Sequence, residues 1–112
     1  MSKEVLQGTL DLMVLRTLET MGSQHRFGLA KRILQLSEGV LDLNQGTLYP
    51  ALLRLEQRGW IKSHWGISEN NRKAKFYALT SKGRKQIAEE AESWQLTVSL
   101  MAKFLSKPKA DL

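Results

Sequence analysis

The sequence has no cysteine among its 112 residues, and its two prolines are too few for a proline-rich linker. The absence of cysteine excludes disulfide bridges, thiol nucleophiles and cysteine-based zinc sites, and it is typical of proteins from a reducing compartment. No run of about 18 uncharged apolar residues occurs, so no transmembrane helix is predicted. The N-terminus does not show the pattern of a signal peptide. We therefore expect a cytoplasmic protein.

Patterns that carry catalysis or bind metals are also missing. His25 and His64 are isolated histidines without partners at ligand spacing, which argues against a metal site or acid–base catalysis. The three glutamates Glu89, Glu90 and Glu92 are more typical of a solvated helix face than of a paired-carboxylate site. No glycine-rich phosphate loop or nucleophile motif is present. We expect no enzyme activity, no metal and no cofactor.

Acidic residues are in the minority, with eleven Asp and Glu against seventeen Lys and Arg, which gives a formal net charge of +6. A positive charge favours polyanionic partners, but many basic domains bind none, so the placement of the charges has to decide. The hydrophobic fraction of 42% and the charged fraction of 25% are close to globular averages. The length predicts a single hydrophobic core.

The hydrophobic pattern predicts two helices in the first third of the chain. Residues 8–21 are apolar on nearly every face, with Thr9 as the expected N-cap and Gly22 as the stop. A helix that is apolar all round must be covered on more than one side, and a second chain can supply that cover. The second helix is predicted over residues 27–36, where apolar residues recur at helical spacing.

A third helix is predicted after a loop, with Asn44 as its N-cap and Gly59 at its end. Pro50 has no N–H to donate, so this helix is expected to begin close to Gly46 or Thr47, or to bend there. Its buried stripe is expected to consist of Leu48, Leu52 and Leu55.

Two strands are predicted next. Residues 60–67 and 74–79 are rich in aromatic and β-branched residues, and the polar residues 68–73 between them suit a hairpin tip. Three short helices would then precede a two-stranded wing. The predicted fold class is mainly α with a small β-hairpin, arranged as a winged helix-turn-helix.

A long helix is predicted over residues 80–105, with Thr80 or Ser81 as N-cap and Pro108 soon after its end. Its apolar residues recur in steps of four and three, a period typical of a helix that packs along another helix. We expect a dimer interface formed by this seam together with two residues of the first helix. The predicted interface residues are Leu10, Val14, Ile87, Ala91, Trp94, Val98, Met101 and Leu105.

In a winged helix-turn-helix the third helix enters the DNA major groove and the wing lies over the adjacent backbone or minor groove. The outer side of the predicted third helix carries groups that can pair with base edges or phosphates. These groups are Gln45, Thr47, Tyr49, Arg54 and Arg58. Taken alone, such residues more often form an ordinary solvated helix face.

The hairpin favours nucleic acid over that simpler interpretation. Arg72, Lys73 and Lys75 cluster there with no acid closer than Glu69, and a concentration of one sign of charge suits phosphate groups. We predict a DNA-binding domain over residues 1–79. Residues 80–112 are expected to be a dimerisation helix followed by a frayed tail.

The chain also resembles a known family over roughly residues 6–105. The residues that carry the resemblance are Leu10 to Leu15, His25-Arg26-Phe27, Ala30-Lys31-Arg32-Ile33, Gly46-Thr47-Leu48-Tyr49-Pro50-Ala51-Leu52, Arg54-Leu55-Glu56, Gly59, Trp65-Gly66, Lys75-Phe76-Tyr77 and Leu79-Thr80. Together they are similar to the PadR-like transcriptional regulators, in the short subgroup with a single C-terminal helix. The run from Gly46 to Leu52 is the most specific part.

The resemblance implies a homodimer joined through the C-terminal helix, acting chiefly as a transcriptional repressor that leaves its operator when an effector binds or conditions change. It also implies that residues 45–49 face the major groove and that the basic wing at 72–75 contacts the DNA backbone. Two positions depart from the family pattern. Arg26 stands where the family often has glycine and is expected to add a phosphate contact, and Ala74 interrupts a basic run that is often unbroken.

Trp94 is the candidate for effector sensing, because a large aromatic at a dimer seam can stack on a flat aromatic ligand. The alternative is that Trp94 simply packs the dimer core. For the whole chain, the competing hypothesis is a protein-interaction or dimerisation module without specific DNA binding, since fold does not determine function. RNA binding is disfavoured because the wing is expected to lack a stacking platform of exposed aromatics.

Overall fold

The computed structural model describes residues 3–108. Capping side chains mark where three of the helices begin: His25 caps α2 (Arg26–Leu36), Asn44 caps α3 (Gln45–Gln57) and Thr80 caps α4 (Ser81–Ser106). Each cap accepts the backbone N–H three residues further on, which satisfies one donor that the first helical turn leaves free. The remaining elements are α1 (Lys3–Met21), β1 (Gln24–His25), β2 (Ile61–Ile67) and β3 (Lys73–Leu79). The predicted fold class, mainly α with a small wing, is confirmed.

Two predicted helix starts are corrected. α1 begins at Lys3, so Thr9 lies inside the helix and is not its N-cap. α3 begins at Gln45, one residue before the expected start near Gly46 or Thr47, and the predicted N-cap Asn44 is confirmed. Pro50 is tolerated within α3, because the one helical bond it cannot donate is that to the carbonyl of Gly46, on an exposed side of the helix.

The wing has a third strand that the sequence pattern did not predict. The sheet has the order β1-β3-β2, and β1 pairs with β3 through Gln24↔Tyr77 and His25↔Phe76. A strand of two residues is too short to show an alternating pattern. Because β1 directly precedes α2, this pairing holds the start of α2 against the wing.

The hairpin tip follows from its residue types. Asn71 has a φ of 58°, in the left-handed region that asparagine tolerates better than most residues. The Ser68 N–H donates to the Arg72 carbonyl at 2.8 Å and closes the loop. The turn places Arg72 at the exposed tip of the wing.

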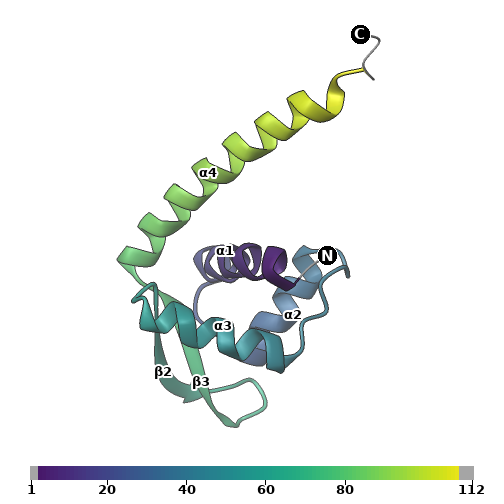
Figure 1. Cartoon of the computed structure of the whole chain (residues 1–112). Helices are drawn as coiled ribbons and strands as arrows, with labels where there is room; N and C mark the ends of the chain where they lie inside the picture. Colours follow the sequence, from purple (N-terminus) through teal and green to yellow (C-terminus); the bar gives the residue numbers. More distant parts are fainter. Residues whose placement is uncertain (1–2, 109–112) are drawn as a thin grey trace.

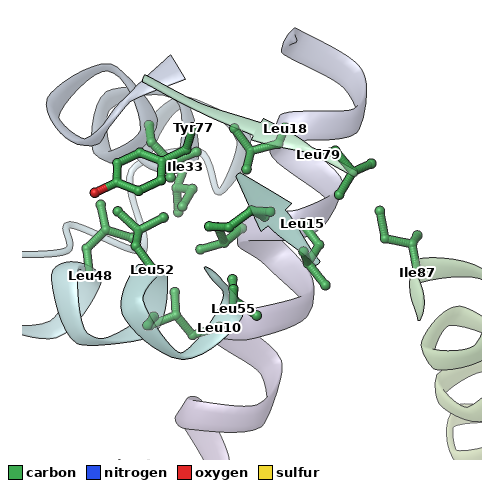
Figure 2. Packing of buried hydrophobic residues seen from close by; sticks show 14 residues of the cluster. Leu10, Leu15, Leu18, Ile33, Leu48, Leu52, Leu55, Tyr77, Leu79 and Ile87 are labelled. Atoms are coloured by element: carbon green, nitrogen blue, oxygen red, sulfur yellow. The ribbon is translucent and has the colours of Figure 1, made fainter. Parts of the chain in front are cut away.

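The core lies between α1, α2, α3, the sheet and the base of α4 (Figure 2). The predicted stripe of Leu48, Leu52 and Leu55 is fully buried, which confirms it. In Figure 2 the Tyr77 ring lies beside Leu48 and Leu52, and Ile87 reaches toward the cluster from α4.

Three residues predicted at the dimer interface lie in this core instead. Leu10, Val14 and Ile87 are buried within the single chain. The body of one chain already covers them, so they do not form a surface that a second chain could contact.

α4 extends beyond the rest of the molecule, on the side opposite the wing tip (Figure 1). The described structure measures 65 × 28 × 22 Å, and this helix accounts for most of its length. From Ala91 to the end of the described chain every residue is exposed. The predicted frayed tail falls largely on residues 109–112, which lie outside the described residues.

Candidate nucleic-acid interface

α3 is fixed to α1 by ion pairs at the side of the helix. The Arg54 guanidinium lies 2.8 Å from the Asp11 carboxylate, and that of Arg58 lies 3.9 Å from the second Asp11 oxygen. Arg54 was predicted to contact DNA. The structure places it against α1, because Asp11 is the nearest partner for its charge, and so removes it from the candidate interface.

The side of α3 that points furthest from the core has three small or apolar residues and the polar Gln57, and it has none of the side chains predicted to contact DNA. Gly46, Pro50, Leu53 and Gln57 are all exposed, and at about 100° per residue they share one face. Side chains as small as those of Gly46 and Pro50 allow another surface to approach the helix backbone closely. Their spacing of four and three was the sequence signal that could have identified this face.

Gln45 and Thr47, both predicted to read bases, are only half-exposed. The Gln45 side-chain amide donates to the Arg26 carbonyl at 3.5 Å, and its Oε1 atom is buried without a partner in the described structure. Gln45 therefore links α3 to the start of α2. The Thr47 N–H donates to the Asn44 cap at 2.9 Å. At about 100° from Gly46 around the helix, Thr47 lies at the edge of the exposed face.

Four of the other predicted residues line one cavity, which we call the wing cleft, whereas Arg72 does not line it. The wing cleft has a volume of about 290 Å³ and lies between α3, the start of α2 and the wing. It is lined by His25, Arg26, Phe27, Tyr49, Trp65, Lys73, Ala74, Lys75 and Tyr77. Four residues that the sequence predicted independently, Arg26, Tyr49, Lys73 and Lys75, are thus brought together.

Strand geometry explains why the wing cations face the cleft. Lys73, Lys75 and Tyr77 alternate along β3 and so share one face of the sheet. Trp65 lies directly opposite Lys75 in the register of β2 and β3, on that same face. Arg26 joins them from α2 because β1 holds that helix start to β3.

Each cation in the cleft is positioned over an aromatic ring. The Arg26 Cζ atom lies 4.9 Å from the centroid of the Phe27 ring and 5.3 Å from that of Tyr49. The Lys73 Nζ atom lies 5.2 Å from the centroid of Trp65. Such contacts hold a cation in place without neutralising it.

Acidic groups do little to balance these charges. Within the described part of the chain, Arg26, Arg72 and Lys73 form no ion pair, and Lys75 lies 4.0 Å from Glu56. The other Glu56 oxygen accepts a 2.6 Å hydrogen bond from Ser63. The cleft therefore carries an excess of positive charge.

Tyr77 forms the floor of the cleft, and its pKa is raised above the ordinary value of 10.0. Burial is the largest cause, and the neighbouring Tyr49 and Glu56 raise the pKa further, while Arg26 lowers it. The Tyr77 phenol therefore stays neutral to a higher pH than an exposed tyrosine does.

The exposed aromatics correct the expectation that the wing has no stacking platform. Trp65 on the wing is 64% exposed, and Phe27 across the cleft is 60% exposed. RNA binding is therefore not disfavoured by a lack of exposed aromatic rings.

A second surface lies on α4, away from the wing. The seam residues Trp94, Val98, Met101 and Leu105 are all exposed. Three further apolar residues of α4 that were not predicted at an interface are also exposed, at a spacing of four: Leu96, Leu100 and Phe104. Trp94 also lines a cavity of about 300 Å³ with Leu12 and Leu15 of α1 and with Trp60.

Within residues 3–108, no group of three histidine, aspartate or glutamate side chains is placed to hold a metal ion. Among the same residues, no helix is both long and apolar enough to cross a lipid bilayer.

Comparisons with known proteins agree with this geometry. A family model described as the transcriptional regulator PadR-like family matches residues 14–89. A transcriptional regulator of known structure from Clostridium thermocellum is 30% identical, and the match covers 95% of this chain and 99% of that one with a TM-score of 0.82.

Two further solved structures share the fold. A PadR-like transcriptional regulator from Bacillus cereus is 23% identical, with 95% and 100% of the two chains covered and a TM-score of 0.80. A PadR family regulator from Eggerthella lenta is 27% identical, with 94% and 88% covered and a TM-score of 0.77.

Proposed function

The chain belongs to the PadR-like family of transcriptional regulators, and we propose that it acts as a homodimeric repressor that binds an inverted-repeat operator in the cytoplasm. Membership of this family makes it a DNA-binding regulator and not an enzyme. The observation that carries this proposal is the wing cleft, where Arg26 and Lys73 lie beside α3 without an acidic partner in the described chain. Family membership also disfavours the interaction module that lacks DNA binding.

In this proposal residues 1–79 bind DNA. α3 enters the major groove with its exposed face of Gly46 and Pro50 against the DNA, and Thr47 and Tyr49 at the edges of that face contact bases. Gln45 acts indirectly, by holding α3 to α2.

The cations of the wing and of α2 would contact the phosphates. Lys73 and Lys75 project from the face of the wing that lines the cleft, Arg72 lies at its tip, and Arg26 projects from the adjacent helix start. Contacts of this kind determine position and overall affinity rather than sequence preference.

Residues 80–112 would join two chains. The exposed apolar side chains of α4 have no cover within the described chain, and Phe104 and Leu105 are 76% and 77% exposed. An exposed apolar stripe of this length is typical of a protein interface. Pairing two such helices around a twofold axis places the two α3 helices to read half-sites about 10 bp apart.

An effector would act at the second surface. The cavity beside Trp94 lies between α1 and α4, where a flat aromatic ligand can stack on the indole ring. A ligand bound there would change the angle at which α4 leaves the body and hence the spacing of the two α3 helices. If Trp94 only packs the dimer, Trp94→Phe will leave operator release unchanged.

Gel shifts test the proposal. A fragment from immediately upstream of the protein's own gene should be retarded at concentrations that leave a scrambled duplex of equal length free. If the dimer contacts six to ten phosphates, affinity should fall by about 10³ to 10⁵ between about 50 and 200 mM salt. Failure to shift any genomic fragment would support the interaction module instead.

A further inference from the structure

The wing cleft has more aromatic surface than contact with a phosphate backbone requires. Phosphates are bound by cations and N–H donors, yet Phe27 and Trp65 in the cleft are each about 60% exposed. Exposing such large rings to water is unfavourable, so a ligand that covers them gains free energy that a phosphate group alone cannot provide.

The dimensions and lining of the cleft suit a small molecule. Its volume of about 290 Å³ lies near the lower limit of small-molecule sites, which combine aromatic walls with a few polar groups. Trp65 and Phe27 supply the walls. Arg26 and Lys73, which have no acidic partner in the described chain, supply positive charge beside those walls.

We propose that the wing cleft binds a small planar aromatic anion, whose ring packs against Trp65 and Phe27 and whose acidic group pairs with Arg26 and Lys73. Because Lys73, Lys75 and Arg26 are also the proposed phosphate contacts, the bound ligand excludes the DNA backbone. This second step rests on the proposed function, whereas the binding itself does not. The site shares no residue with the cavity beside Trp94.

Calorimetry on the full chain without DNA tests the binding. The probes are adenosine monophosphate, which carries both a ring and an anion, adenosine, which lacks the anion, and inorganic phosphate, which lacks the ring. The nucleotide should bind at least about tenfold more tightly than either of the others, because stacking and charge each contribute. Inorganic phosphate binding as tightly as the nucleotide would overturn the proposal.

Variants locate the site. Trp65→Ala should weaken nucleotide binding about 10- to 100-fold, as expected for loss of one stacking ring, and Trp65→Phe should restore most of the affinity. Trp65 is largely exposed, so the fold should persist, which the thermal unfolding midpoint would verify. His64→Ala is the control, because it removes an exposed ring from the neighbouring position of β2, whose side chain points to the opposite face of the sheet. This variant should bind the nucleotide normally. Normal binding by Trp65→Ala, or lost binding by His64→Ala, would contradict the assignment.

Two competition experiments complete the test. A short single-stranded oligoadenylate that binds more than tenfold tighter than the nucleotide at high salt would show that the cleft takes a nucleic-acid strand, against the proposal. Saturating nucleotide should release duplex DNA from the wild-type chain but not from Trp65→Ala. Nucleotide binding without DNA release would overturn the exclusion step alone. A chain that binds the nucleotide but no DNA would instead refute the proposed function.

Discussion

Gly83 shows how strongly one residue can depend on its surroundings. A Cβ atom at this position would lie 2.1 Å from the Trp60 carbonyl oxygen and 2.7 Å from a methyl group of Leu79. Gly83→Ala should therefore destabilise the fold by about 1–3 kcal/mol, although alanine is normally the better helix former.

Gly8 is the matched control, because it also lies in a helix but would place its Cβ in open space. Gly8→Ala should stabilise the protein by about 0.5–1 kcal/mol. Urea unfolding followed by circular dichroism compares the two. If both substitutions changed the free energy of unfolding in the same direction, the contact between α4 and Trp60 would not be tight.

Tyr77 should link stability to alkaline pH. Its pKa in the folded chain is raised above 10.0, mainly by burial, so the unfolded chain releases this proton first. The stability that the neutral phenol contributes is complete below about pH 10 and is lost as the pH rises through the folded pKa.

The two tyrosines of the chain allow a clean measurement of this titration. In Tyr49→Phe, Tyr77 is the only tyrosine, and its ultraviolet absorbance reports the tyrosinate directly. We expect a midpoint above 10.0, because burial remains the largest cause of the shift. A midpoint at 10.0 or below would mean that water reaches the ring.

The wing cations and the α3 residues should affect DNA binding in different ways. The double variant Arg72→Ala and Lys73→Ala should weaken binding to all duplexes and reduce the salt dependence, since it removes phosphate contacts. Thr47→Ala or Tyr49→Phe should instead reduce the difference in binding affinity between operator DNA and scrambled DNA. Titrations at two salt concentrations separate these outcomes, and equal losses from both classes of variant would refute the division.

At the scale of elements, the cap of α3 sets the orientation of the exposed face. Asn44 Oδ1 accepts the Thr47 N–H at 2.9 Å, and removing such a cap costs about 1 kcal/mol. Asn44→Ala should lower the free energy of unfolding by about that amount and weaken operator binding, because the first turn of α3 becomes less ordered.

Asn44→Ser is the control for this cap. Serine is a comparable N-cap, so the free energy of unfolding and the operator affinity of Asn44→Ser should both be close to those of the wild type. Denaturation measures the stability, and gel shifts measure the operator affinity. Full operator affinity in Asn44→Ala would mean that DNA orders the first turn without the cap.

At the scale of the whole molecule, α4 is exposed from Ala91 onward, and a second chain should cover its apolar side. Ala91→Glu places a charge on the predicted seam and should yield monomers in sedimentation, with most of the DNA affinity lost. A carboxylate there would have to be desolvated on association.

Ser99→Glu introduces the same side chain on the polar side of α4, roughly 100° from the neighbouring seam residue Val98. This variant should stay dimeric. An unchanged dimer in Ala91→Glu would place the interface elsewhere, whereas monomers in both variants would mean that the interface surrounds the whole helix.

The sequence by itself determined the order and type of the long elements. Periodicity requires only local spacing, so the stripe of Leu48, Leu52 and Leu55, the hairpin and the length of α4 could be predicted without coordinates. The cluster of positive charge from Arg72 to Lys75 could likewise be identified from the sequence alone.

Only the tertiary structure decided which of these residues meet. β1 pairs two residues with β3, too few for a pattern, yet this pairing brings Arg26 to the wing cleft. Asp11 draws Arg54 away from the exposed face over a separation of 43 residues. The apolar spacing is the same whether a residue is buried by its own chain or by a second chain, so it could not show that the single chain buries Leu10, Val14 and Ile87. The physical reason is common to all three cases: hydrophobic burial and ion pairing depend on distance in space, and the spacing of residues along one element does not record what packs against it.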